Sequence, residues 1–225
     1  MADWQLHWLE AEGSLAPWRA RIEEEVAAAH RAVARLLQPP RLDVLVQRLR
    51  GAAIPELGLV GHAYRRSLFS LTLDPDNPNF AAALHGDTLR RHVAHEVHHC
   101  LRMGGPGYGR TLGEALVSEG LAGHFSQECF GGAPEIWETA LDVVGLRVLA
   151  PQAKAALARA DYGHDAWFFG RGEGAPPRWA GYTLGFALVC AYLTADPDAR
   201  PSALAGAPAA AILDDAWPRL FTVPE

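Results

Sequence analysis

The sequence predicts an α+β fold, in which a small N-terminal sheet packs on a mainly helical body. Runs of alternating apolar and polar residues in the N-terminal third are typical of strands with one buried face. From residue 87 onward the chain is predicted to be mainly helical. Its 225 residues, 49% apolar and 20% charged, fit one well-buried domain. We therefore expect a single domain over 1–225, with a helix and sheet region at 1–86 and a helical region at 87–225.

The N-terminal region divides into a helix, two stretches of strand and a turn. The first forty residues are predicted to form a helix, because apolar residues recur there at spacings of three and four and the pattern ends at two prolines, 39–40. Residues 42–46 and 57–73 are predicted strands, since they are apolar or alternate between apolar and polar. The segment 74–79, rich in Asp, Asn and Pro, is predicted to close the sheet region with a turn.

Two further segments are indicated in the C-terminal half. Glycine and proline dominate residues 171–177, which are predicted to form a flexible loop before a helix over about 182–194. The longest uncharged run, 179–195, is shorter than the ~20 apolar residues of a membrane span. It is therefore interpreted as a buried helix, and no membrane span is expected.

Charge and cysteine content exclude some classes of function. A net charge of −6 gives no general attraction to the phosphates of nucleic acids or to anionic lipid surfaces, so nucleic acid is not an expected partner. The N-terminal residues lack the basic start and apolar stretch of a signal peptide. Three widely spaced cysteines fit reduced thiols better than a disulfide framework. A cytoplasmic protein is therefore predicted.

Four of the ten histidines fall between positions 92 and 99, and part of this cluster has the spacing of a metal site. His95, Glu96 and His99 satisfy the His-Glu-x-x-His pattern within a predicted helix. At 3.6 residues per turn the two histidines lie one above the other, so both imidazoles can reach one ion. Zinc prefers such nitrogen ligands, and the glutamate beside them is placed to take a proton from water.

A catalytic zinc site needs a third protein ligand, and two glutamates further along are candidates. Glu114 follows Thr111 in the pattern of a capping box, which gives it a structural role. Glu119 points about 140 degrees away from Glu114 on a helical wheel, and its small neighbours would let its helix approach the histidine helix closely. The glycine-rich segment 104–109 supplies the reversal between the two helices. We expect Glu119 to complete a site for one Zn²⁺, with Glu114 as the competing candidate.

These motifs resemble a known class of enzyme. His95, Glu96 and His99, followed by Glu119, look like the gluzincin class of zinc peptidases, in which a helical glutamate is the third ligand. More closely, the histidine motif and three later segments resemble a bacterial family of predicted zinc-dependent proteases of uncharacterised function. The segments are Leu112-Gly113-Glu114-Ala115, Ser118-Glu119-Gly120-Leu121-Ala122 and Gly181-Tyr182-Thr183-Leu184-Gly185. The resemblance implies a zincin-like metallopeptidase domain with an active-site helix and a glutamate-ligand helix.

The resemblance has one departure from thermolysin-like enzymes. The Asn that precedes the ligand glutamate in those enzymes is absent, and Ser118 stands before Glu119. Gly123 occupies the position where an acidic residue would support the ligands. Thermolysin-like specificity is therefore not expected.

Three other residues of the histidine segment have weaker cases. His92 shares the helix face of the predicted ligands and could line the site, although a local hydrogen bond in the first turn fits it better. His98 points about 100 degrees away from His95, so it is interpreted as a supporting or packing residue. Cys100 is not expected to be a nucleophile, because adjacent residues on a helix do not face one another.

A peptidase also needs a donor for the oxyanion that forms on the attacked carbonyl. Tyr182 is the candidate, because it follows the predicted loop and starts a helix in a segment that resembles the family. An anchoring role in the core is an equally good interpretation of this tyrosine. Arg178 and His164 are weaker candidates for the donor.

The function predicted from these residues is that of a zinc metallopeptidase, a hydrolase with Glu96 as general base and a peptide or protein as substrate. A strand over 67–73 could present an edge to which an extended peptide binds. Two alternatives remain open: a metal-dependent hydrolase of a small non-peptide amide or ester, and a chaperone-like protein that binds metal without turnover. The sequence does not indicate an oligomeric state.

Overall fold

A computed structural model describes residues 3–221, which form two compact units. The first unit comprises the residues up to Gly104 together with Cys129–Gly131, and the second comprises the remaining described residues. The fold is α+β, as predicted, because strands occur only in the first unit among the described residues and the second is helical. The expectation of one domain over 1–225 stays a prediction.

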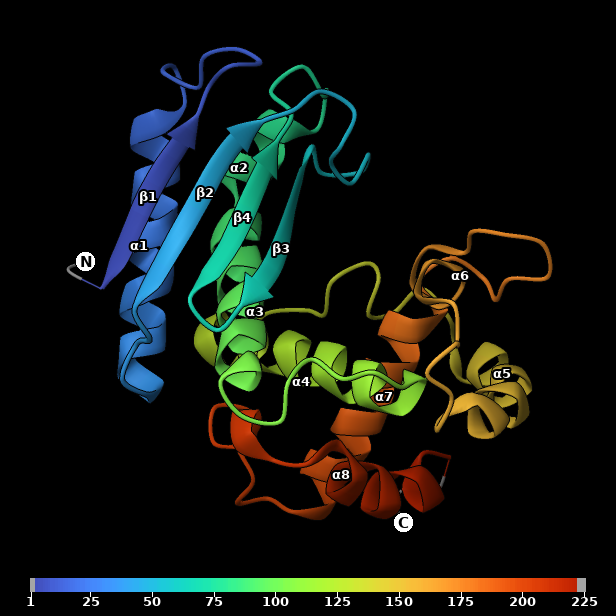
Figure 1. Ribbon diagram of the computed structural model, residues 1–225. Coiled ribbons are helices and arrows are strands. Elements are labelled where there is room, and N and C mark those ends of the chain that lie inside the picture. The colour runs from blue at the N-terminus through green and yellow to red at the C-terminus, as the bar shows by residue number, and fades with distance from the viewer. Residues whose placement is uncertain (1–2, 222–225) are drawn as a thin grey trace. The chain divides into compact units, whose positions relative to one another are not determined.

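The first unit contains a four-stranded sheet in the order β1-β2-β4-β3 (Figure 1). Its strands are β1 (Trp4–Leu9), β2 (Leu42–Arg48), β3 (Leu59–Arg65) and β4 (Leu68–Leu73). β1 and β4 both pair with β2 in parallel, whereas β3 pairs with β4 antiparallel. The expectation that residues 67–73 form an edge is therefore wrong, because β4 has a neighbour on both sides and the edge strands of this sheet are β1 and β3.

The predicted helix over the first forty residues is confirmed in part. Helix α1 runs over Arg19–Leu36, but residues 4–9 form the strand β1, and residues 1–2 lie outside the described part of the chain. Within β1, Trp4 is buried, Gln5 is exposed and residues 6–8 are half-buried, so the strand has no clear burial period of its own. The helical spacing begins only at Trp18, so the prediction extended a real helix too far towards the N-terminus.

Helices α1 and α3 (Thr88–Met103) lie on the same face of the sheet, and the short helix α2 (Phe80–His85) precedes α3 (Figure 1). The predicted turn at 74–79 separates β4 from α2. The inward strand residues Val44, Val46 and Leu71 are fully buried. Helix α3, which carries the histidine motif, is therefore placed by burial against β3 and β4.

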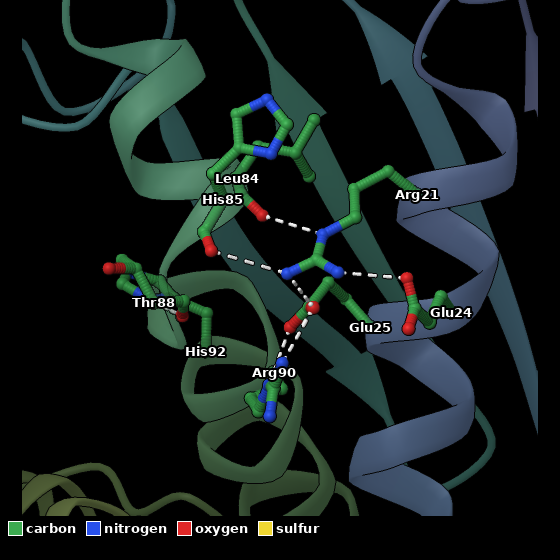
Figure 2. A network of polar contacts seen from close by, with 8 residues as sticks. All are labelled: Arg21, Glu24, Glu25, Leu84, His85, Thr88, Arg90 and His92. Atoms are coloured by element: carbon green, nitrogen blue, oxygen red, sulfur yellow. Dashed lines mark hydrogen bonds and ion pairs between the residues drawn. The ribbon is translucent and has the colours of Figure 1, made fainter.

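A buried ion-pair cluster joins α1 to α3, as Figure 2 shows. The side chain of Glu25 on α1 is 0% exposed and accepts two hydrogen bonds from Arg90 of α3, at 2.6 and 2.8 Å. Arg21, one turn earlier on α1, lies 2.7 Å from the same carboxylate and donates to the carbonyl oxygens of Leu84 and His85. The cluster fixes α1, α2 and the first turn of α3 to one another.

Two further arginines explain why residues 129–131 belong to the first unit. Arg35 of α1 donates to the carbonyl oxygen of Cys129 at 3.2 Å. Arg91 of α3 donates to the carbonyl oxygen of Gly131 at 2.5 Å. Helix C-termini leave carbonyl groups without intrahelical partners, and guanidinium groups satisfy them well.

The second unit is built from helices. They are α4 (Leu112–Phe130, whose last two residues belong to the first unit), α5 (Val143–Ala156), α6 (His164–Phe169), α7 (Ala180–Ala195) and α8 (Ala209–Ala216), with short 3₁₀ turns at Leu204–Gly206 and Trp217–Arg219. The predicted loop over 171–177 lies between α6 and α7, and the predicted helix over 182–194 is α7. None of the described helices is both long enough and apolar enough to cross a membrane.

Helices α4 and α7 pack through glycines in this unit. A Cβ atom added at Gly120 of α4 would collide with the carbonyl oxygen of Gly185 on α7. A Cβ at Gly185 would in turn collide with the carbonyl oxygen of Leu116. Gly120 therefore allows close contact with α7, and the predicted approach of α4 to the histidine helix stays a prediction.

Candidate metal centre

His95 and His99 lie one turn apart on α3, as the pattern predicts. Their Nε2 atoms are 3.0 Å apart, and the two rings meet edge to face with centroids 4.7 Å apart. His99 is buried, and His95 is partly exposed. Two nitrogens bound to one tetrahedral zinc ion at about 2.0 Å lie roughly 3.3 Å apart, so this pair already has nearly the separation that a shared ion needs.

Glu96 is buried between α3 and the edge strand β3. Its side chain occupies the space that a Cβ at Gly61 of β3 would take: such an atom would lie 2.7 Å from Glu96 Cδ. Glu96 is 6% exposed. A glycine at this point of the strand therefore makes room for the carboxylate that the sequence predicts as general base.

The other three residues discussed for the histidine segment, His92, His98 and Cys100, are buried on α3. The Nδ1 atom of His92 lies 2.9 Å from the carbonyl oxygen of Thr88, which confirms the predicted local hydrogen bond. Burial lowers the pKa of His92 to about 4, so this imidazole is neutral at physiological pH. His98 is fully buried, in agreement with a packing role. Burial raises the pKa of the Cys100 thiol to about 12, which agrees with the expectation that it is no nucleophile.

The two candidate glutamates of α4 differ in the contacts that they make. Glu114 Oε2 accepts hydrogen bonds from the backbone N–H of Arg110 at 2.7 Å and of Thr111 at 2.9 Å. The N–H of Glu114 donates to Thr111 Oγ1 at 3.3 Å, so the predicted capping box is present. Glu119 lies outside this box and is 8% exposed.

Tyr108 is the residue next to Glu119 that the sequence interpretation missed. Its hydroxyl donates to Glu119 Oε1 at 2.7 Å, and the hydroxyl of Ser118 donates to the carbonyl oxygen of Tyr108 at 2.6 Å. Burial and the Glu119 carboxylate raise the pKa of Tyr108 well above its ordinary value, which keeps the phenol protonated. A lone tyrosine among the glycines of 104–109 was the available signal, but that segment was interpreted only as a reversal.

Tyr182, the predicted oxyanion donor, lies in the first turn of α7 and is partly exposed. Its ring meets Phe168 edge to face at 4.9 Å. The weaker candidates differ: Arg178 is exposed and lies over the Trp179 ring at 4.0 Å, whereas His164 Nδ1 lies 3.0 Å from the hydroxyl of Tyr162. Both interpretations of Tyr182, anchor and donor, therefore remain compatible with its position.

Glu138 supplies a buried carboxylate at a place where the sequence suggested none. The notional Cβ of Gly123 would collide with Glu138 Oε1, so this carboxylate lies against α4 one turn after Glu119. Glu138 is 5% exposed, and its Oε2 accepts from the N–H of Glu135 at 2.7 Å. Gly123 thus leaves room for an acidic group from another segment, which no local pattern in the sequence indicates.

Among residues 3–221, one group of three potential ligands could hold a metal ion: His95, His99 and Glu119. One ligand atom from each lies within 4.8 Å of the other two. Two imidazole nitrogens and one carboxylate oxygen make a donor set that catalytic zinc sites use. These are the residues that the sequence predicts as ligands; their binding of a metal stays a prediction.

Comparison with known proteins gives one result. No curated protein and no solved structure matches the chain. One family model matches residues 16–214, which is most of the sequence. The chain therefore belongs to the family described as "Predicted Zn-dependent protease (DUF2268)".

Proposed function

We propose that this protein is a zinc-dependent peptidase. His95, His99 and Glu119 are the proposed ligands of one zinc ion, Glu96 the general base and Tyr182 the oxyanion donor. The observation that carries the proposal is the grouping of those three ligand atoms within 4.8 Å, with the motif glutamate Glu96 beside them in the sequence. Membership of a family described as predicted zinc-dependent proteases supports it.

The chemistry divides between the ion and the protein. A bound zinc ion acts as a Lewis acid and lowers the pKa of a water molecule towards ~7. Glu96 takes a proton from the attacking water and transfers it to the leaving amine, so one carboxylate serves both halves of the reaction. Tyr182 donates a hydrogen bond to the carbonyl oxygen as negative charge develops on it.

The edge strand β3 supports a peptide as the substrate. Among the strands that the structure describes, β3 has one neighbour, β4, apart from a single bridge between Leu59 and Ile54. An extended peptide can pair with such an edge through backbone hydrogen bonds. Because Gly61 of β3 lies against Glu96, a peptide on this edge would lie close to the general base.

The decisive experiment combines metal analysis with the nearly isosteric substitution Glu96→Gln. The purified protein should contain about one zinc per chain and hydrolyse dye-labelled casein. Glu96→Gln should keep the zinc and lower the rate by about 10²–10⁴-fold, the usual contribution of a general base. Glu173→Gln, in the exposed loop before α7, is the matched control and should leave the rate unchanged.

Other outcomes would replace the proposal. A Glu96→Gln protein that retains zinc and cleaves at the wild-type rate contradicts the role of Glu96. Hydrolysis of small esters or amides without cleavage of casein favours the small-molecule hydrolase. Unfolding on chelation, in a protein without hydrolytic activity, favours a chaperone-like protein in which the metal stabilises the fold.

A further inference from the structure

The glycine-rich loop before α4 has a conformation that delivers one side chain to this helix. Gly107 and Gly109 have φ angles of +89° and +113°, a region that favours glycine, and Tyr108 stands between them. A Cβ at Gly109 would also collide with Glu114 Cβ, so the loop passes directly against the first turn of α4. The loop therefore does more than reverse the chain, since its path brings Tyr108 to α4.

Two adjacent residues of α4 form hydrogen bonds with Tyr108, one with its backbone and the other with its side chain. Ser118, fully buried, donates its hydroxyl to the backbone carbonyl of Tyr108 at 2.6 Å. Glu119 accepts the phenol hydroxyl at 2.7 Å. A backbone bond and a side-chain bond to the same helical turn leave the tyrosine little rotational freedom, so it can in turn fix the orientation of the carboxylate.

We propose that Tyr108 is a positioning residue for Glu119: its hydroxyl binds Oε1 and holds the carboxylate in one orientation, in which Glu119 would bind a zinc ion through its other oxygen. This inference rests on the proposed function, because it takes Glu119 as a zinc ligand. Carboxylates that bind metals are commonly oriented by hydrogen bonds from neighbouring groups, and loss of such a partner costs about 10–100-fold in metal affinity. In this role Tyr108 would act through its hydrogen bond to Glu119 and not as a ligand itself.

The test is the affinity for zinc, measured in competition with a chromophoric chelator at a temperature where circular dichroism shows native helix content. Tyr108→Phe removes only the hydroxyl and should weaken zinc binding by about 10–100-fold. Tyr192→Phe, in the last turn of α7, is the control, because it removes a tyrosine hydroxyl that takes no part in the Tyr108–Glu119 hydrogen bond, and it should bind zinc as the wild type does.

A double-mutant cycle separates positioning from a general effect on the fold. In a Glu119→Ala background, Tyr108→Phe should cause no further loss of zinc affinity, because the carboxylate that it orients is gone. Equal losses in both backgrounds, or wild-type affinity in Tyr108→Phe, would overturn the positioning role while leaving the zinc site in place. A wild-type protein without zinc affinity would overturn the proposed function, and this inference with it.

Discussion

The helices α3 and α4, which carry the proposed ligands, are held in different ways. Helix α3, besides its apolar packing on the sheet, is tied to α1 by charge, through the buried carboxylate of Glu25 and its two hydrogen bonds from Arg90. Helix α4 meets α7 through the backbone at Gly120 and Gly185, where no side chain intervenes. The difference teaches that α3 tolerates few changes of charge at its contact with α1, whereas α4 tolerates few changes of side-chain size at its contact with α7.

The ion-pair cluster around Glu25 predicts the largest loss of stability. Glu25→Ala leaves Arg90 and Arg21 without their shared carboxylate, although both keep 27–30% of their side chains exposed. We expect the free energy of unfolding to fall by about 3 kcal/mol, at the low end for a broken buried ion pair because the arginines regain some hydration. Urea denaturation followed by tryptophan fluorescence measures it.

Glu24 provides the control for that experiment. Its side chain is 63% exposed and pairs with Arg21 at 2.8 Å. Glu24→Ala should change the free energy of unfolding by less than about 1 kcal/mol, as exposed pairs do. Equal losses of unfolding free energy in Glu25→Ala and Glu24→Ala would show that burial of the Glu25 carboxylate adds nothing to stability. Charge would then not distinguish α3 from α4.

The distance along the sequence between interacting residues explains what could be predicted from the sequence. The spacing of His95, Glu96 and His99 is local to one helix, and the capping box of Glu114 spans four residues, so both follow from short-range pattern. The strand β1 was missed because the helical spacing of the next segment was extended over it. Its pairing with β2 joins residues more than thirty positions apart, which short-range periodicity does not contain.

The contact of α4 with α7 predicts a smaller loss of stability, caused by overpacking and not by a broken ion pair. Gly120→Ala drives a Cβ into the backbone of Gly185, which cannot move aside as a flexible side chain would. We expect a loss of about 2 kcal/mol in the free energy of unfolding, typical of overpacking. The measurement is again urea denaturation.

Gly145 of α5 provides a matched helical glycine. Its added Cβ would meet mainly the side chain of Leu141, at 3.2 Å, so the helix propensity of alanine can outweigh the contact. Gly145→Ala should leave the stability unchanged or raise it by up to about 1 kcal/mol. If Gly120→Ala were equally harmless, backbone contact would not be what holds α4.

The residues that contact Glu119 and the next turn of α4 could not be predicted either, because they come from other segments of the chain. Tyr108 reaches it from a loop, and the carboxylate of Glu138 reaches the neighbouring turn of α4 from a different segment. Each contact depends on the path of the chain outside regular elements, where hydrophobic periodicity carries no information. The sequence could show that Gly123 is small, but not which group uses the space.

The smallest expected loss of stability distinguishes Glu114 from Glu119 on α4. Glu114→Ala removes an acceptor for the N–H groups of Arg110 and Thr111, so we expect a loss of about 1 kcal/mol in stability with unchanged zinc affinity. Those N–H groups lower the pKa of Glu114, so its stabilisation is complete above the ordinary pKa of glutamate and is lost as the pH falls through the lowered value. The difference in stability between wild type and Glu114→Ala should therefore shrink in acid.

Glu119→Ala should show the opposite pattern, a large loss of zinc affinity, because it would remove a proposed ligand rather than a cap. Urea denaturation at neutral and acidic pH, together with chelator competition, compares the two variants. A loss of zinc affinity in Glu114→Ala alone would move the third ligand to Glu114. It would also give the capping residue of α4 the role now proposed for Glu119, and α4 would then contribute to the site through its first turn.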